Sequence, residues 1–211
     1  AFGLAVARGS SRVPAEQTAK VCSGLRDFMI RAGSCLCRGG VHTPNHRWAV
    51  CMALSRLHSL FPDKAYLSRI DQWLREGIDI DPDGQFHEKS SAIYSPLTDR
   101  CLITIARLLH RPQLLEPVRR NLDMTLYYIH ADGEIVTEAS RRQDQYQRAT
   151  LAPYYYPYRY MALQDRNGRY AAMTRLIEKT AGDELADERI HFQEDNSLSA
   201  EMPAEQPLPE S

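Results

Sequence analysis

Residues 81–112 read DPDGQFHEKSSAIYSPLTDRCLITIARLLHRP and contain a turn, a polar loop and a helix, in that order. Leu97, Cys101, Ile105 and Leu108 recur at steps of four, four and three, which places them on one face of a helix. The Arg-Pro pair at the end stops that helix, because proline lacks an amide donor and restricts the residue before it. This stretch predicts an all-α fold.

The same apolar periodicity occurs elsewhere along the chain. Six more helices are predicted, at Val21–Ala32, Val50–Phe61, Tyr66–Leu74, Leu115–Ile129, Leu151–Met161 and Tyr170–Ile177. Glycine-rich and Pro-Asp segments separate them. Alternating runs are too short to demand a sheet, although residues 85–87 and 134–137 can form short extended pieces. Cys51 and Cys101 lie among apolar residues at helical spacing, so we expect both in the core.

A faint internal repeat organises the polar loops. Asp83–Ser90 resembles Asp132–Ser140, which begins 49 positions later and contains one more residue. An earlier loop, Gly39–His46, lies 44 positions before the first copy when Gly40 is aligned with Gly84. Stacked antiparallel helix hairpins with repeats of this length form solenoids or closed toroids, in which equivalent loops line up on one face.

Composition narrows the classes of partner. The chain has 211 residues, with Lys+Arg 26 against Asp+Glu 27, and a formal charge of −1. A net charge this close to zero gives no general attraction to nucleic acid or anionic lipid. The apolar runs are too short for a membrane span. No signal peptide is recognised. We expect a loose segment at 1–16, a helical domain at 17–182, and an exposed, acidic, proline-containing tail at 183–211.

Three clusters of polar side chains belong to the three loops. The first is TPNHRW at 43–48, where Thr43 or Asn45 can cap the next helix and the proline suits its first turn. Taken singly, each cluster has an ordinary structural explanation, such as a helix cap, a packing tyrosine or a solvated charge run. If the three loops are equivalent in the fold, the three clusters would lie close together on one face. The candidate site residues are Asn45, His46, Arg47, His87, Glu88, Tyr94, Arg141, Arg142 and Gln143.

The ordered segments TPNHRW, DGQFHEKSSAIYSP and DGEIVTEASRRQDQ resemble the α/α-toroid domain of the heparinase II/III-like polysaccharide lyases, which is similar in fold to alginate lyases. The resemblance covers about residues 17–180 and implies a partial (α/α) toroid. In that family an Asn-His pair opens one helix and a tyrosine follows on the next loop, as Asn45, His46 and Tyr94 do here. Family members usually also carry a longer toroid and a β-sandwich domain, which we do not recognise in this chain.

The resemblance implies β-elimination at a uronate in an acidic polysaccharide. We expect no cofactor, and a metal site of the family's β-sandwich cannot be assigned to any residue of this chain. Asn45, aided by Arg47 or Arg142, would neutralise the substrate carboxylate. His46 would be the base and Tyr94 the acid, or Tyr94 would serve as both. The other candidate residues would contact the sugars: His87, Glu88, Arg141 and Gln143, with Arg47 and Arg142 in the same role. A secreted or periplasmic location would follow from the family.

Two alternatives stay open at this point. A glycoside hydrolase on a similar toroid needs two placed carboxyl groups, for which Glu88, Glu138 and Asp144 are available. A non-catalytic carbohydrate-binding scaffold would need the arginines and aromatic residues, but neither His46 nor Tyr94. In the tyrosine-rich segment at 154–160 we expect most of the rings to pack between helices, and one or two of them are available to stack on sugar rings.

Overall fold

The computed structural model describes residues 15–40 and 43–209, so most of the expected loose segment 1–16 lies outside the described residues. Within the described ranges the secondary structure is helical, with no β-strand, which confirms the all-α prediction. The α-helices are α2 (Ala15–Arg38), α3 (Pro44–Leu60), α4 (Lys64–Arg75), α5 (Tyr94–Leu109), α6 (Leu115–Thr125), α7 (Tyr155–Asp165), α8 (Gly168–Thr180) and α9 (Ile190–Glu194).

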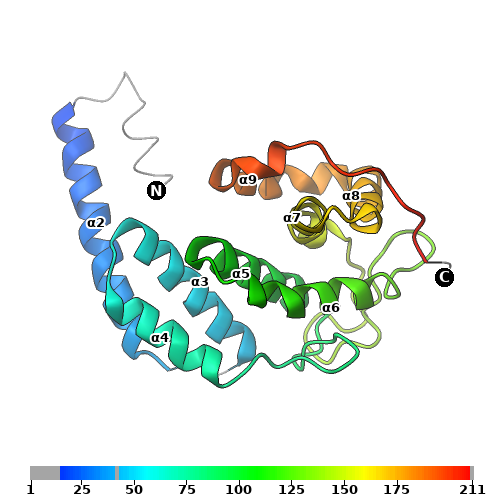
Figure 1. Ribbon diagram of the computed structural model, residues 1–211, viewed down its shortest axis with the longest axis horizontal. Helices are drawn as coiled ribbons and strands as arrows, with labels where there is room; N and C mark the ends of the chain where they lie inside the picture. Colours follow the sequence, from blue (N-terminus) through cyan, green and yellow to red (C-terminus); the bar gives the residue numbers. More distant parts are fainter. Residues whose placement is uncertain (1–14, 41–42, 210–211) are drawn as a thin grey trace.

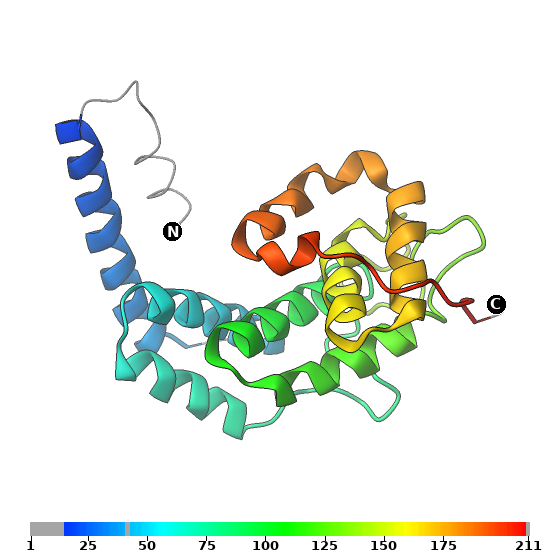
Figure 2. The same cartoon turned by 45° about the horizontal axis from the view of Figure 1, so that its top comes forward.

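Helices α3 to α8 form three successive hairpins. In each hairpin the first helix packs against the second, and α3 and α7 both pack against α5. The hairpins follow one another in a curved row, with α2 at one end and α7 to α9 at the other (Figures 1 and 2). Each of α3, α5 and α7 follows a polar connection, so the sequence repeat corresponds to a repeat of hairpins. All seven predicted helices are present.

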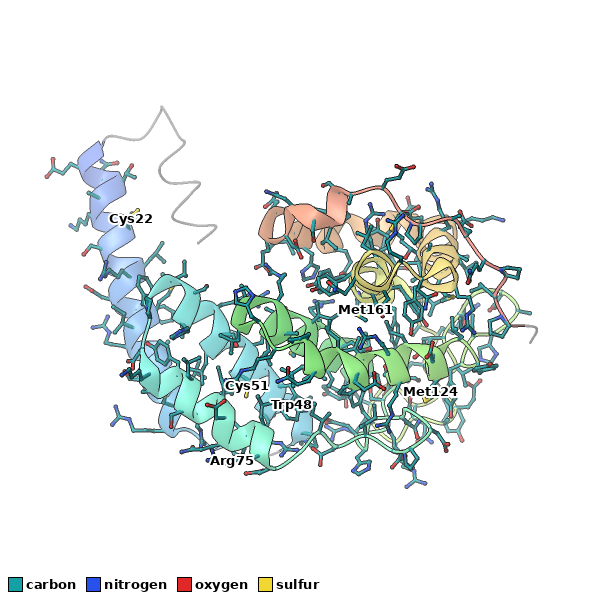
Figure 3. The ribbon with its side chains drawn as sticks, in the orientation of Figure 1. Cys22, Trp48, Cys51, Arg75, Met124 and Met161 are labelled. Carbon is teal, nitrogen blue, oxygen red and sulfur yellow. The ribbon has the colours of Figure 1, made fainter. Side chains whose placement is uncertain are left out.

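The core lies between successive hairpins. Trp48 and Cys51 of α3 lie among α3, α4 and α5 (Figure 3), and both are buried. Burial raises the pKa of the Cys51 thiol and of the Cys101 thiol to about 12, so both stay protonated at neutral pH. These two cysteines are core residues, as predicted.

The tyrosine-rich segment is part of the same core. The five tyrosines of 154–160 are all buried. Tyr154 donates a hydrogen bond of 2.7 Å to the Ser91 carbonyl, and Tyr158 donates one of 2.8 Å to the Leu122 carbonyl. The Tyr154 hydroxyl thus joins the turn before α7 to the loop before α5, and the Tyr158 hydroxyl joins α7 to α6. The predicted packing role of these tyrosines is confirmed.

The polar loops repeat in three dimensions. An isolated antiparallel bridge joins Ile80 to Phe86, and a second joins Ile129 to Ile135, with both partners shifted by the same 49 positions as the sequence repeat. The predicted extended pieces are therefore reduced to single bridges. Gly84 and Gly133 occupy the same place in the two loops, with φ of 96° and 88°. A left-handed backbone at this point explains glycine in both copies.

Part of the apolar stripe of α2 is exposed, although the sequence predicted that the stripe would be buried. Val21 is 54% exposed and Phe28 is 64% exposed, although helical spacing placed both on a buried face. The helix packs on α3 and α4 near its carboxyl end, where Gly33 lies against the Tyr66 ring. The amino-terminal half extends away from the hairpins (Figure 1). No described helix is long and apolar enough to cross a membrane.

Residues 183–199 differ from the exposed tail that was expected. Short helical turns and α9 cover this part of the chain, and His191 and Leu198 are buried. Acidic side chains of the segment pair with arginines of the hairpins: Glu194 lies 2.7 Å from Arg56, and Asp195 lies 3.4 Å from Arg107. Glu194 and Asp195, two of the acids from which a solvated tail was predicted, therefore attach the segment to α3 and α5.

Acid should weaken this attachment. His191 stacks on Tyr156 with ring centroids 4.2 Å apart, and burial, reinforced by Arg100, lowers its pKa to about 4. Because an unfolded histidine titrates near 6.5, the unfolded chain binds the proton first as the pH falls. The neutral ring therefore contributes stability that is complete above about pH 6.5 and is lost toward pH 4, up to about 3 kcal/mol.

Urea unfolding across this range measures the loss. The His191→Phe variant keeps the stack and should lack this pH dependence; an unchanged slope would contradict the account.

Asp99 should have the opposite pH dependence. It is fully buried on α5, neither carboxyl oxygen has a hydrogen-bond partner, and burial raises its pKa well above the ordinary value. The unfolded chain releases this proton near pH 4 while the folded chain keeps it, so stability is lost as the pH rises above that value. We expect Asp99→Asn to be the more stable protein at pH 7, by at least about 1 kcal/mol, and the difference to shrink toward pH 4. Calorimetric Tm values at both pH values test this, and a less stable variant at pH 7 would refute it.

Candidate functional site

Glu88 joins the first two polar loops. Its carboxylate accepts a hydrogen bond of 2.7 Å from the Asn45 side-chain amide and one of 3.2 Å from the Asn45 backbone N–H. The Glu88 side chain is only 6% exposed, and Asn45 is buried. The loop before α5 is thereby fixed to the start of α3.

The start of α3 explains why a carboxylate binds there. Thr43 occupies the N-cap position with an extended backbone and Pro44 is the first helical residue, as predicted, but the Thr43 side chain does not cap the helix. Its hydroxyl instead lies 3.2 Å from the Asn45 side-chain oxygen. Glu88 supplies the missing acceptor from another loop, where the helix dipole also favours a negative charge.

Arg142 connects this pair to Tyr94. Its guanidinium lies 3.2 Å from the Glu88 carboxylate and covers the Tyr94 ring, 5.0 Å from the ring centroid. The next residue, Gln143, donates a hydrogen bond of 2.5 Å to the Tyr94 hydroxyl. A continuous series of contacts therefore runs from Asn45 on the first loop to Tyr94 and Gln143 on the second and third.

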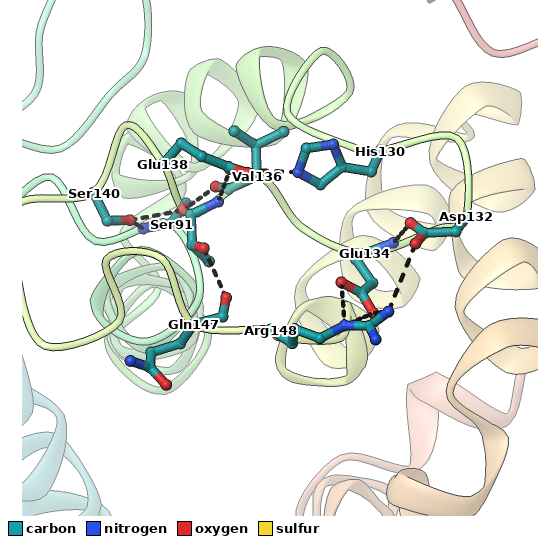
Figure 4. Close-up of polar contacts among 10 residues, drawn as sticks. Ser91, His130, Asp132, Glu134, Val136, Glu138, Ser140, Gln147 and Arg148 are labelled. Atoms are coloured by element: carbon teal, nitrogen blue, oxygen red, sulfur yellow. Dashed lines mark hydrogen bonds and ion pairs between the residues drawn. The ribbon is translucent and has the colours of Figure 1, made fainter.

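The second and third loops are fastened to each other by repeated serines. Ser91 and Ser140 are 49 positions apart, and their hydroxyls lie 2.9 Å from each other. Ser91 also donates a hydrogen bond of 2.5 Å to the Val136 carbonyl (Figure 4). Asp144 accepts from the Ser140 hydroxyl at 3.0 Å and from the Ala92 backbone at 3.1 Å. This buried scaffold holds the loops that carry Tyr94 and Arg142 together.

The structure places the other predicted residues around this group. His46 is exposed at the first turn of α3. Arg47 is mostly buried and pairs with Glu76 at 2.9 Å and with Asp79, so its guanidinium is already engaged.

His87 and Arg141 lie on the second and third loops. His87 lies 2.9 Å from Asp81 within its own loop. The Arg141 backbone donates a hydrogen bond of 2.7 Å to the Lys89 carbonyl, and its side chain is exposed.

Two roles were missed from the sequence. The contact of Glu88 with substrate stays a prediction, but the sequence did not indicate that its carboxylate would accept from Asn45 at the start of α3 and lie 3.2 Å from Arg142. Asp144 was only one of several free carboxyl groups, whereas it is a buried anchor between two loops. The repeat contained a signal for this scaffold, since it aligns the neighbourhoods of Ser91 and Ser140.

Glu138 differs from Glu88 in its environment. It is exposed, and its pKa is lowered by hydrogen bonds from its own backbone N–H and from His130, whose ring nitrogen lies 3.3 Å away (Figure 4). A carboxyl group with a lowered pKa is a poor proton donor at neutral pH, which weighs against Glu138 as the acid of a hydrolase.

Among residues 15–40 and 43–209, no three His, Cys, Asp or Glu side chains are grouped so that they could hold a metal ion. In comparisons with protein-family models, with curated proteins and with solved structures, nothing matches this chain.

Proposed function

We propose that this chain is the helical domain of a lyase that cleaves uronate-containing polysaccharide by β-elimination, and that its curved row of hairpins is an arc of an (α/α) toroid. The observation that carries the proposal is the series of contacts from Asn45 through Glu88 and Arg142 to Tyr94. It joins an amide, a guanidinium and a phenol from three loops. These are groups that proton abstraction next to a carboxylate requires.

Arg142 is the best placed group to bind the substrate carboxylate. A guanidinium has five N–H donors, and Nη1 of Arg142 lies 3.2 Å from the Glu88 carboxylate. The Arg142 side chain is 35% exposed, so its remaining donors can take a carboxylate in a bidentate arrangement. Binding there would offset the charge that develops when the neighbouring C–H loses its proton.

Tyr94 is the proposed proton donor to the leaving oxygen. Its ring is half-buried under Arg142, and Gln143 holds its hydroxyl. His46, exposed one residue after Asn45, is the proposed base; Tyr94 acting as both base and acid is the alternative assignment. Asn45 would act through Glu88, because its amide is bound to that carboxylate.

A screen of uronate polymers tests the proposal. Heparan sulfate, hyaluronan, alginate, pectic acid and glucuronan are each incubated with the protein, and near-ultraviolet absorbance is followed. A lyase leaves a double bond conjugated to the carboxylate and absorbance rises, whereas a hydrolase or a binding scaffold gives no rise. Absence of a rise on every polymer, with the chain shown to be folded, would refute the proposal.

A further inference from the structure

The amino-terminal half of α2 exposes an apolar stripe. Val21, Leu25 and Phe28 are 54%, 38% and 64% exposed, and their spacing of four and three residues places them on one side of the helix. Figure 1 shows that this half of α2 extends away from the hairpins. A single exposed apolar side chain needs no explanation, but three neighbours on a projecting helix indicate a contact surface.

The hairpins contact a different side of α2. Arg26 covers the Phe61 ring, 5.3 Å from the ring centroid, and Gly33 lies against the Tyr66 ring. With 3.6 residues per turn, the apolar stripe is turned roughly 120° away from the side that carries Arg26 and Gly33. The hairpins of the same chain therefore leave the stripe uncovered.

A stripe of four charged side chains runs along the same helix. They alternate in sign and are spaced by four, seven and four residues: Glu16, Lys20, Asp27 and Arg31. They lie within about 60° of one another around the helix axis. All four are exposed, and within residues 15–40 and 43–209 none of them has an ion-pair partner.

The order of these charges is complementary to itself when it is reversed. In an antiparallel pair of α2 helices with residue 16 opposite residue 31, Glu16 faces Arg31 of the second copy and Lys20 faces Asp27 of the second copy. The two-fold axis repeats both contacts, so all eight charges are paired. A parallel pair in register would instead place like charges opposite each other. The charge order therefore favours an antiparallel second copy.

The same register brings the apolar stripes together. It places Phe28 of one copy beside Val21 of the second copy, with both Leu25 side chains near the two-fold axis. Gly24 lies at the crossing point, between the charged and the apolar stripe, and an added Cβ there would meet nothing within 4 Å. The two backbones can therefore approach closely. Residues 15–30 span about 24 Å of helix, so the contact is at the small end for a specific interface.

We propose that α2 is a dimer contact whose occupant is the antiparallel α2 of a second copy of this chain. The inference is independent of the proposed function, since it uses no residue of the candidate site. Because the contact is small and flanked by charges, we expect a dimer that dissociates at micromolar concentrations, with a Kd of about 1–100 µM, and that salt weakens.

Sedimentation equilibrium of the full chain tests the charge pairing. It is run in reducing buffer, because Cys35 is exposed on the same helix. Lys20→Glu and Asp27→Lys should each raise the dimer Kd at least about tenfold, since each variant places like charges together at two positions. The double variant K20E/D27K restores opposite charges and should return the Kd to within about threefold of the original value. Lys64→Glu, the same change at an exposed position of α4, is the matched control and should leave the Kd unchanged.

A second pair of variants tests the apolar stripe. Phe28→Ser should raise the Kd at least about a hundredfold, because the dimer loses two buried rings. Ile30→Ser changes a side chain that is 37% exposed on the other side of α2 and should have no effect. Circular dichroism shows that each variant is folded. A chain that stays monomeric at millimolar concentration, a dimer that Phe28→Ser does not weaken, or a double charge variant that dimerises no better than the single ones would overturn the proposal.

Discussion

Replacing Tyr94 with phenylalanine is expected to lower kcat on the preferred polymer by about 10³-fold, with little change in KM. The substitution removes one hydroxyl and keeps the ring beneath Arg142. The leaving oxygen would then receive no proton from this side chain. Because the proton is transferred only in the transition state, its loss lowers kcat. The measurement is the initial rate of absorbance increase over a range of polymer concentrations.

The control for this variant is a tyrosine outside the site. Tyr127 is exposed, and Tyr127→Phe removes the same hydroxyl while leaving the contacts of Tyr94 with Arg142 and Gln143 in place. It should keep the rate of the unmodified protein. Circular dichroism must show that Tyr94→Phe melts normally. A folded variant that retains more than about a tenth of the rate would exclude Tyr94 as the acid.

Replacing Gly84 with alanine is expected to destabilise the fold by about 3–5 kcal/mol. Gly84 has φ of 96°, and an added Cβ would overlap the Arg120 carbonyl, lying 2.7 Å from its carbon atom. The loop has little freedom to move away, since the buried Asn121 amide donates a hydrogen bond of 2.9 Å to the Gly84 carbonyl. A loss of this size is a large part of the stability of a typical domain. Urea unfolding measures it.

Two other glycines make this prediction quantitative. Gly77 has φ of 85° but open space around an added Cβ, so Gly77→Ala should cost only the backbone strain of about 1 kcal/mol. At Gly133, the equivalent of Gly84 in the repeat, an added Cβ would lie 3.0 Å from a methyl group of Thr180, so an intermediate loss is expected. Equal losses for Gly77→Ala and Gly84→Ala would show that contact with Arg120 is unimportant.

The helices and their order could be predicted because apolar periodicity is local. Each predicted stripe overlaps a helix, although the stripe from Leu115 to Ile129 runs past the end of α6 at Thr125. The 49-residue offset correctly paired the loops that contain Gly84 and Gly133. Periodicity does not say what covers an apolar face, and for this reason the stripe that contains Val21 and Phe28 was wrongly expected to be buried.

The differences at the carboxyl end and in the site have one cause. A run of acids predicts solvation when its partners are unknown, but Glu194 pairs with Arg56, which is 138 positions away. In the same way, the sequence placed Glu88 and Asn45 on neighbouring loops without indicating that one would bind the other. Pairings between distant side chains depend on the completed packing of the hairpins, which local pattern cannot provide.

The most direct test of the central claim is the mass of the cleavage product made in heavy-oxygen water. β-Elimination breaks the glycosidic bond without adding water, so we predict a uronide product lighter by one water molecule than the hydrolysis product and free of the heavy isotope. A product that contains heavy oxygen at the new end would identify a hydrolase and contradict the assignment of Arg142 and Tyr94 to elimination.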